Sequence, residues 1–89
     1  MVNYSAMPWV VKLTKDGNRV SVEELFDAVD AAVQAGNAAI RAGDADEVTI
    51  ASREHQAIYY EFSSVRTASE ERRISQMLSS ELAAASTSH

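Results

Sequence analysis

The sequence contains no cysteine, which excludes disulfide bonds, thiolate catalysis and cysteine-bound zinc. It has a single proline, Pro8, which biases the preceding Met7 towards an extended backbone. No stretch of about 18 apolar residues occurs, so we expect no segment to span a membrane. The first eleven residues lack both the charged start and the long apolar run of a secretion signal, so we interpret the chain as cytosolic.

Basic residues are also few: 8 Lys and Arg stand against 13 Asp and Glu, for a formal net charge of −5. Non-specific binding to nucleic acid depends on Lys and Arg, so wrapping DNA or binding an anionic membrane is disfavoured. An acidic surface would instead suit a protein that lines a path along which DNA slides. The 89 residues, 46% of them hydrophobic, fit one small domain whose modest core would gain stability from a partner or an oligomer.

The first part of the chain predicts a short strand and then a helix. Residues 9–14, WVVKLT, are rich in strand-forming side chains, and residues 15–18, KDGN, carry an Asp-Gly turn signal. Residues 19–20 either return as a second short strand or lead directly into the helix. Ser21 and Glu24 then form a capping-box pattern, which predicts that the helix begins there.

Apolar residues at steps of three and four predict that this helix extends over residues 22–42 and has one apolar face. The members of that face are Val22, Leu25, Phe26, Val29, Val33, Gly36 and Ile40. We expect Asn37 among the polar residues on the other sides of the helix. Gly43 is expected to end the helix, because glycine readily adopts the left-handed conformation found there.

Two segments of alternating apolar and polar residues follow. Residues 47–51, EVTIA, and 56–62, QAIYYEF, flank the short polar stretch SREH, and this pattern predicts a β-hairpin. Its apolar face would carry Tyr60, and its other face would carry Tyr59. Ile58 and Phe62 belong with Tyr60, whereas Thr49 and Glu61 belong with Tyr59.

A second helix is predicted after the hairpin. Thr67 and Glu70 form another capping box, with Ser64 as an alternative, earlier cap. The expected apolar face comprises Ile74, Met77, Leu78, Leu82 and Ala85.

These elements predict an α+β fold in the order long helix, β-hairpin, second helix (α-β-β-α), preceded by an N-terminal arm with a short β-strand. We divide the chain into the arm and short strand (1–20), the helix–hairpin–helix domain (21–86) and a flexible tail (87–89). Both helices would cover one face of the hairpin and leave the other face for water or a partner.

No pattern for catalysis or metal binding emerges. The acids Asp44, Asp46 and Glu47 lack the spacing of a calcium loop, so we interpret them as a solvated turn rather than an ion site. His55 falls at the expected tip of the hairpin, where a general base would lack a pocket and a positioned neighbour. The sequence has no glycine-rich phosphate loop and no HExxH motif. We therefore expect no enzyme, no cofactor and no metal.

Several residues are instead candidates for a protein interface: Tyr4, Met7, Trp9, Arg53, His55, Tyr59 and Arg66. Tyr59 either packs across the strands or contacts another protein, since tyrosine supplies much contact area at low entropy cost. Trp9 and its neighbours either pin the arm to its own core or insert into a neighbouring molecule. Arg66, with Arg72 and Arg73, either pairs with nearby glutamates or forms a small nucleic-acid patch.

The segments SVEELFDAVDAAVQAGNAAIRAG, EVTIA, IYYEF and SSVRTASEERRISQMLSSELAAA, from Ser21 to about Ala85, resemble the phage head–tail joining protein W family. That family has a helix, a β-hairpin and a second helix. The stretch 1–20 has no counterpart in the family pattern, and the hairpin is more acidic here than is usual for the family.

The resemblance implies a structural virion protein that joins the phage head to the tail. Such proteins form a homo-oligomeric ring under the portal, contact portal and tail-side connector proteins, and let DNA pass without sequence-specific binding. The implied location is the virion, assembled in the host cytoplasm. Two alternatives remain: a small acidic inhibitor that binds a host protein complex, and a small dimeric regulator or antitoxin that binds DNA.

Overall fold

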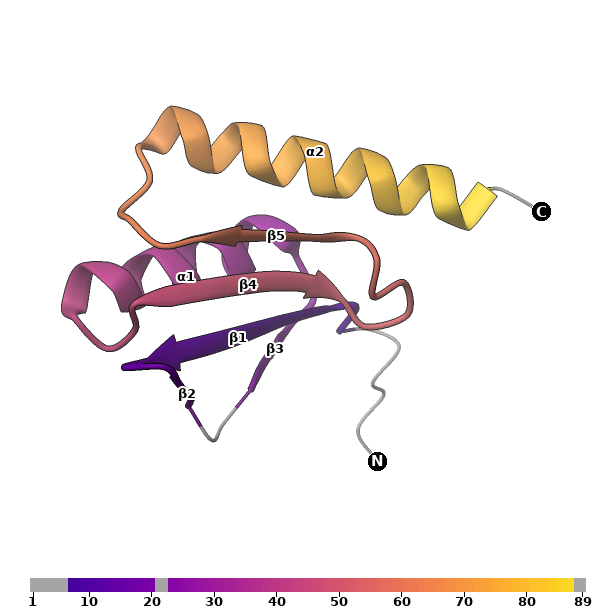
Figure 1. Ribbon diagram of the computed structural model, residues 1–89. Coiled ribbons are helices and arrows are strands. Elements are labelled where there is room, and N and C mark those ends of the chain that lie inside the picture. The colour runs from indigo at the N-terminus through magenta and orange to yellow at the C-terminus, as the bar shows by residue number, and fades with distance from the viewer. Residues whose placement is uncertain (1–6, 21–22, 88–89) are drawn as a thin grey trace.

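The computed structural model describes residues 7–20 and 23–87. Its elements are β1 (Trp9–Lys15), β2 (Asn18–Arg19), β3 (Glu24–Phe26), α1 (Val29–Ala42), β4 (Glu47–Ser52), β5 (Tyr59–Phe62) and α2 (Ala68–Thr87). All strand pairs are antiparallel. Within the described residues the fold is an α+β domain with strands first and a five-stranded sheet (Figure 1).

β1 is a central strand of this sheet. Its first residues pair with β3 and its last residues with β2, on one side, while β4 lies along its other side. β5 follows β4, so the order across the sheet is β2 or β3, then β1, β4 and β5. The turn between β1 and β2 has positive φ at both Asp16 (53°) and Gly17 (80°). Asp-Gly accommodates that geometry, which confirms the predicted turn.

The predicted helix-first order is therefore wrong. Three strands precede α1, and β1, expected to belong to an arm, is joined to β4 over six residue pairs from Trp9 to Thr14. The predicted helix over 22–42 begins only at Val29, after Ala28, whose backbone is extended and whose side chain makes no cap. Ser21, the expected cap, lies outside the described residues.

The segment around Leu25 and Phe26 is a strand because it completes the hydrogen bonding of β1. Phe26 pairs with Trp9 and Leu25 with Val10, so the two side chains lie on opposite faces of the sheet. In a helix they would have been neighbours on one apolar face. Periods of two and 3.6 residues cannot be told apart over so short a stretch, and the need of β1 for a second partner decides between them.

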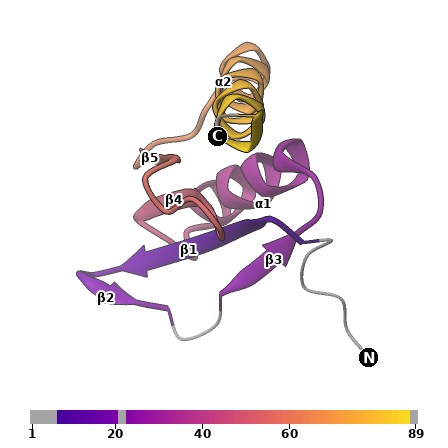
Figure 2. The same ribbon diagram turned by 90° about the vertical axis from the view of Figure 1, so that its right-hand side faces the viewer.

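Both helices lie on the same side of the sheet (Figure 2). α1 packs on β1 and β4, and α2 packs on α1 and touches β5. The hydrophobic core fills the space between them, and its fully buried members include Val33, Val48, Ile50 and Leu78. Met77, predicted to face the core from α2, is instead 38% exposed.

Gly36 brings α1 close to the sheet. It is buried, as the predicted apolar face required, and a Cβ atom at this position would lie 2.5 Å from Cγ1 of Val48. No side chain larger than hydrogen fits there without movement of the helix or of Val48. The glycine therefore sets the distance between α1 and β4.

Asn37 is buried, contrary to the expectation that it lies on the polar side of α1. Its amide nitrogen donates to the carbonyl oxygen of Arg66 (2.8 Å) and to Oε2 of Glu71 (2.7 Å). Its carbonyl oxygen accepts the backbone N–H of Arg66 at 2.7 Å. One side chain thus holds the loop that leads into α2, and the burial is compensated by three hydrogen bonds.

Other local predictions are confirmed. Gly43 ends α1 with a left-handed backbone, and its N–H and that of Asp44 return to carbonyls of the last helical turn. Strands β4 and β5 form the predicted hairpin. Thr67 Oγ1 accepts the N–H of Glu70 (3.1 Å), and Glu70 accepts the N–H of Thr67 (2.9 Å), which is a capping box.

Candidate functional site

The face of the sheet turned away from the helices, which we name the open face, is the candidate site. Strand register places its side chains in two rows across β1, β4 and β5. Val10, Ala51 and Tyr59 form the apolar row, and Lys12, Thr49 and Glu61 form the polar row. No helix of the described residues covers this face, since α1 and α2 both pack on the other one.

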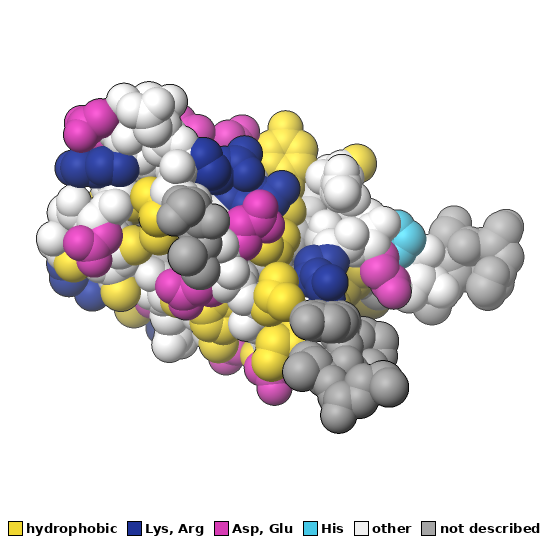
Figure 3. Space-filling view, turned by 90° about the horizontal axis from the view of Figure 1, so that it is seen from below, with side chains coloured by type: hydrophobic (Ala, Val, Ile, Leu, Met, Phe, Trp, Pro, Cys, Tyr) yellow, Lys and Arg dark blue, Asp and Glu magenta, His cyan; other side chains and the backbone are white. Residues whose placement is uncertain are grey.

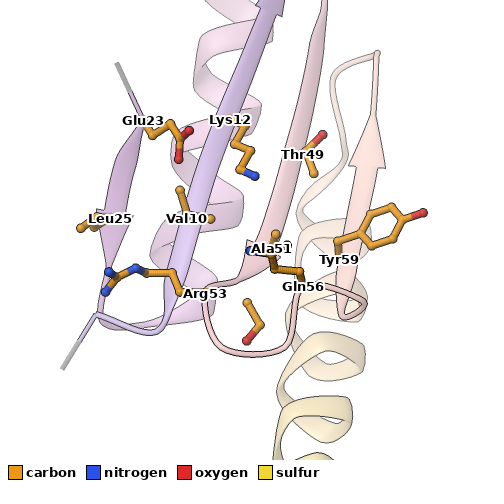
Figure 4. Close-up of a pocket in the computed structure, with 10 residues that line it drawn as sticks. Val10, Lys12, Glu23, Leu25, Thr49, Ala51, Arg53, Gln56 and Tyr59 are labelled. Atoms are coloured by element: carbon orange, nitrogen blue, oxygen red, sulfur yellow. The ribbon is translucent and has the colours of Figure 1, made fainter. Parts of the chain in front are cut away.

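All members of the two rows except Glu61 line a shallow groove of about 390 Å³ (Figure 4). The other residues of its lining are Glu23, Leu25, Ser52, Arg53 and Gln56. Its floor is made of the short side chains of Val10, Ala51 and Thr49, which lie on the two central strands, β1 and β4. Val10 and Ala51 are shielded from solvent and belong to no part of the core cluster. Tyr59 stands at one side of the groove with 50% of its surface exposed, the largest exposure of any large hydrophobic residue that the structure describes.

The charges around the groove are of both signs. Lys12 and Arg53 contribute positive charge and Glu23 contributes negative charge. Glu61 adds a negative charge outside the groove, next to Thr49 on the open face. Thr49 Oγ1 donates to Oε2 of Glu61 at 3.4 Å, which links the two side chains within the polar row. The view from below shows the same mixture of hydrophobic, basic and acidic side chains (Figure 3).

Three of the predicted interface residues, Met7, Trp9 and Arg53, lie close together near the start of β1. Trp9 is buried in the core, so of the two alternatives for the arm the structure has the one in which the tryptophan pins it to its own domain. Arg53 donates to the carbonyl oxygen of Met7 at 3.1 Å and lines the groove. Tyr4 lies outside the described residues.

His55 lies in the turn between β4 and β5, as predicted, and is half-buried. Its N–H donates to Oγ of the buried Ser52 (3.1 Å), and its carbonyl oxygen accepts the N–H of Ile58 (2.8 Å). These contacts use the backbone of His55 to shape the turn. Among its described contacts, no carboxylate or hydroxyl orients the imidazole ring.

Arg66 serves the fold rather than a separate patch. Its backbone binds Asn37, and its guanidinium lies 3.2 Å from Oε2 of Glu70 and donates to Ser64. Pairing with a nearby glutamate is one of the two alternatives that the sequence analysis gave for Arg66. Arg66 lies beside α1 and α2, on the side of the sheet opposite the open face, so the predicted interface residues do not form one surface.

The acidic turn after α1 is fixed by Asp46. Its Oδ2 accepts the N–H of Asp16 at 2.7 Å, and its Oδ1 lies 3.3 Å from the ammonium group of Lys15. The hydrogen bond from Asp16 lowers the pKa of Asp46, and Lys15 lowers it further. The carboxylate thus ties the β1–β2 turn to the start of β4.

The described residues contain neither a cluster of metal ligands nor a helix that could span a membrane. No group of three or more His, Asp or Glu side chains there is arranged to hold a metal ion. No helix in residues 7–20 or 23–87 is long and apolar enough to cross a membrane. Comparison with protein-family models, with curated proteins and with solved structures finds no match.

Sequence reasoning found Tyr59 on the open side of the hairpin, together with Thr49 and Glu61, and the structure confirms that placement. It missed Val10, Lys12 and Ala51 as members of the same surface. The available signal was the alternation within residues 9–14, which separates Val10 and Lys12 from Trp9 and Val11. That signal could not show that β1 lies beside β4.

Proposed function

We propose that this protein is a non-catalytic subunit of a protein assembly and that it binds its neighbours through the open face. The observation that carries the proposal is the half-exposed Tyr59 beside a groove whose floor includes Val10 and Ala51 and whose sides are polar. Tyrosine is enriched in protein interfaces, because it provides a large contact area and loses little conformational freedom on binding. The small core of an 89-residue domain gains stability from such contacts.

Site-specific photo-crosslinking tests this proposal. A benzoylphenylalanine in place of Tyr59 should give a discrete crosslinked product in the native host cells, whereas the same residue in place of the exposed Glu81 on α2 should give none. The product should also disappear when the open face is changed by Ala51→Arg. Equal crosslinking from both positions, or none from position 59, would contradict a binding function for the open face.

The phage head–tail connector is a narrower form of this proposal. It rests on the sequence resemblance of residues 21–85 to that family, although β3 (Glu24–Phe26) occupies the place where the first helix of the family would begin. The small size and the net charge of −5 agree with a protein near a DNA channel. This form predicts a ring on the portal, with the tail-side connector as the second neighbour and no sequence-specific contact with DNA. Electron microscopy of the protein mixed with its portal tests it: particles without added density at the portal would contradict the connector role.

The mixed charge of the open face bears on the two alternative functions. An inhibitor that acts by acidic mimicry needs a face of predominantly negative charge, and a DNA-binding regulator needs a basic one. Lys12 and Glu61 occupy the same row of the open face, so this surface has neither property. Neither alternative gains support from the groove.

A further inference from the structure

We propose that the open face binds a second copy of this chain, in a two-fold dimer whose axis runs along β4. This inference rests on the proposed function and deepens it by naming the partner. A two-fold contact joins the same surface of both subunits, so the surface must be complementary to itself. The two rows of the open face meet that requirement in shape and in charge.

The symmetry of the rows follows from the strand order. β4 lies between β1 and β5, so a two-fold rotation about an axis along β4 places β1 of one copy over β5 of the other. Ala51 and Thr49, on β4, then face their own counterparts. Both side chains are short, which lets the two sheets approach.

In the apolar row, this rotation places Tyr59 over Val10 of the second copy, because both residues pair with Ala51 from opposite sides. The ring of Tyr59 points outward from β5 at the edge of the groove (Figure 4), and Val10 belongs to the lining of that groove. Each tyrosine therefore enters the groove of the other subunit. The contact occurs twice in the dimer and removes from water the most exposed large hydrophobic side chain among the described residues.

In the polar row, the same rotation places Glu61 over Lys12 of the second copy, because both pair with Thr49. Opposite charges therefore meet twice across the interface. The hydrogen bond from Thr49 holds Glu61 in the row in advance. A rotation about an axis across the strands would not bring these two residues together, so the pairing of Lys12 with Glu61 selects the axis along β4, which also places Glu47 opposite its own counterpart.

The two rows include far fewer residues than the roughly 20–30 per partner of a standard interface. We therefore expect a weak dimer whose population depends on concentration. Sedimentation velocity with wild-type protein from about 10 μM to about 1 mM should show a mass that rises towards twice the 9.7 kDa of one chain. A monomer over the whole range would overturn the inference.

A charge exchange tests the specific pairing. Lys12→Glu places acid against acid, and Glu61→Lys places base against base, so each change should weaken the dimer about tenfold or more. The double variant, Lys12→Glu with Glu61→Lys, restores opposite charges and should return the dissociation constant to within about threefold of wild type. Arg72→Glu and Glu81→Lys make the same charge changes on α2 and should leave it unaltered.

Circular dichroism of every variant confirms that it remains folded before its mass is measured. A dimer that is insensitive to Lys12→Glu and Glu61→Lys, or a double variant that does not recover, would overturn the inference. So would a dimer weakened equally by the α2 controls. The crosslinking experiment separates this failure from that of the proposed function: a product of Tyr59 with a different protein supports a binding face but contradicts self-association.

Discussion

The close packing of α1 against the sheet at Gly36 can be tested by Gly36→Ala. At an unhindered helical position this change stabilises a protein by about 0.5–1 kcal/mol, because alanine has the higher helix propensity. Here the added Cβ would lie 2.5 Å from Cγ1 of Val48, 3.3 Å from Cδ1 of Ile50 and 3.4 Å from Cζ of Phe62. The first distance is far shorter than a carbon–carbon contact permits.

The clash is relieved only if α1 or the side chain of Val48 moves, and both are held in place by packing. Val48 is fully buried and β-branched, so its χ1 angle has little freedom. α1 would have to shift away from β4, or Val48 would have to leave its preferred rotamer. Overpacking of this kind costs about 1–3 kcal/mol, which exceeds the gain in propensity. We therefore expect Gly36→Ala to lower the free energy of unfolding by roughly 1 kcal/mol, and by no more than about 2.5 kcal/mol.

Urea unfolding, followed by far-ultraviolet circular dichroism and by the fluorescence of the buried Trp9, measures the effect. Ala38→Gly, at an exposed position of α1, is the matched control and should cost about 1 kcal/mol through propensity alone. Val48→Ala removes the clashing methyl groups, so the double variant should lose less than the sum of the two single changes. A stabilising Gly36→Ala would refute the close approach of α1 to β4.

Three further variants test the contacts that hold the helices. Asn37→Ala leaves the N–H and carbonyl of Arg66 without their partner and should cost about 2–4 kcal/mol in a urea melt; a loss below about 0.5 kcal/mol would show that the loop is held otherwise. Thr67→Ala removes the cap of α2 and should cost about 1 kcal/mol, whereas an unchanged melt would mean that the cap adds nothing. Hydrogen bonds from the N–H and hydroxyl of Thr67 lower the pKa of Glu70, so its ionised form stabilises the fold above the usual value of 4.5, and this stabilisation is lost as pH falls through the lowered pKa. The stability difference between wild type and Glu70→Gln should therefore be constant at neutral pH and shrink in acid; a difference that grows in acid would contradict the assignment.

Local signals in the sequence predicted the elements that depend on neighbouring residues. The Asp-Gly turn, the hairpin around His55 and the cap at Thr67 all rest on contacts between residues that lie close together in the sequence. Such contacts leave a direct trace in residue type and spacing. They were sufficient to place Tyr59 on the open face.

The segment 22–28 could not be assigned in this way, because a partner distant in sequence decides its structure. Its apolar residues satisfy a helical period, and its Ser21–Glu24 pattern resembles a cap. Leu25 and Phe26 nevertheless form a strand, because they pair with the side of β1 that β4 does not occupy. Tertiary pairing outweighs local propensity here, and the helix starts seven residues later than predicted.

The candidate site was only half predictable for the same reason. Tyr59, Thr49 and Glu61 belong to one hairpin, so the alternation of that hairpin placed them together. Val10 and Lys12 join them only because β1 pairs with β4, a contact between residues about 40 positions apart. The burial of Asn37 was not predicted, because a polar side chain suggests exposure. Its amide is buried because it forms hydrogen bonds with the N–H and the carbonyl oxygen of Arg66.

The role of the open face as the binding surface can be measured most directly by solution NMR of the wild-type chain. Amide chemical shifts recorded from dilute to concentrated protein report which surface becomes covered as the copies associate. We predict changes centred on Val10, Lys12, Thr49, Ala51 and Tyr59, with the exposed side of α2 unaffected. Shifts that are independent of concentration, or changes confined to α2 around Glu81, would contradict the proposal.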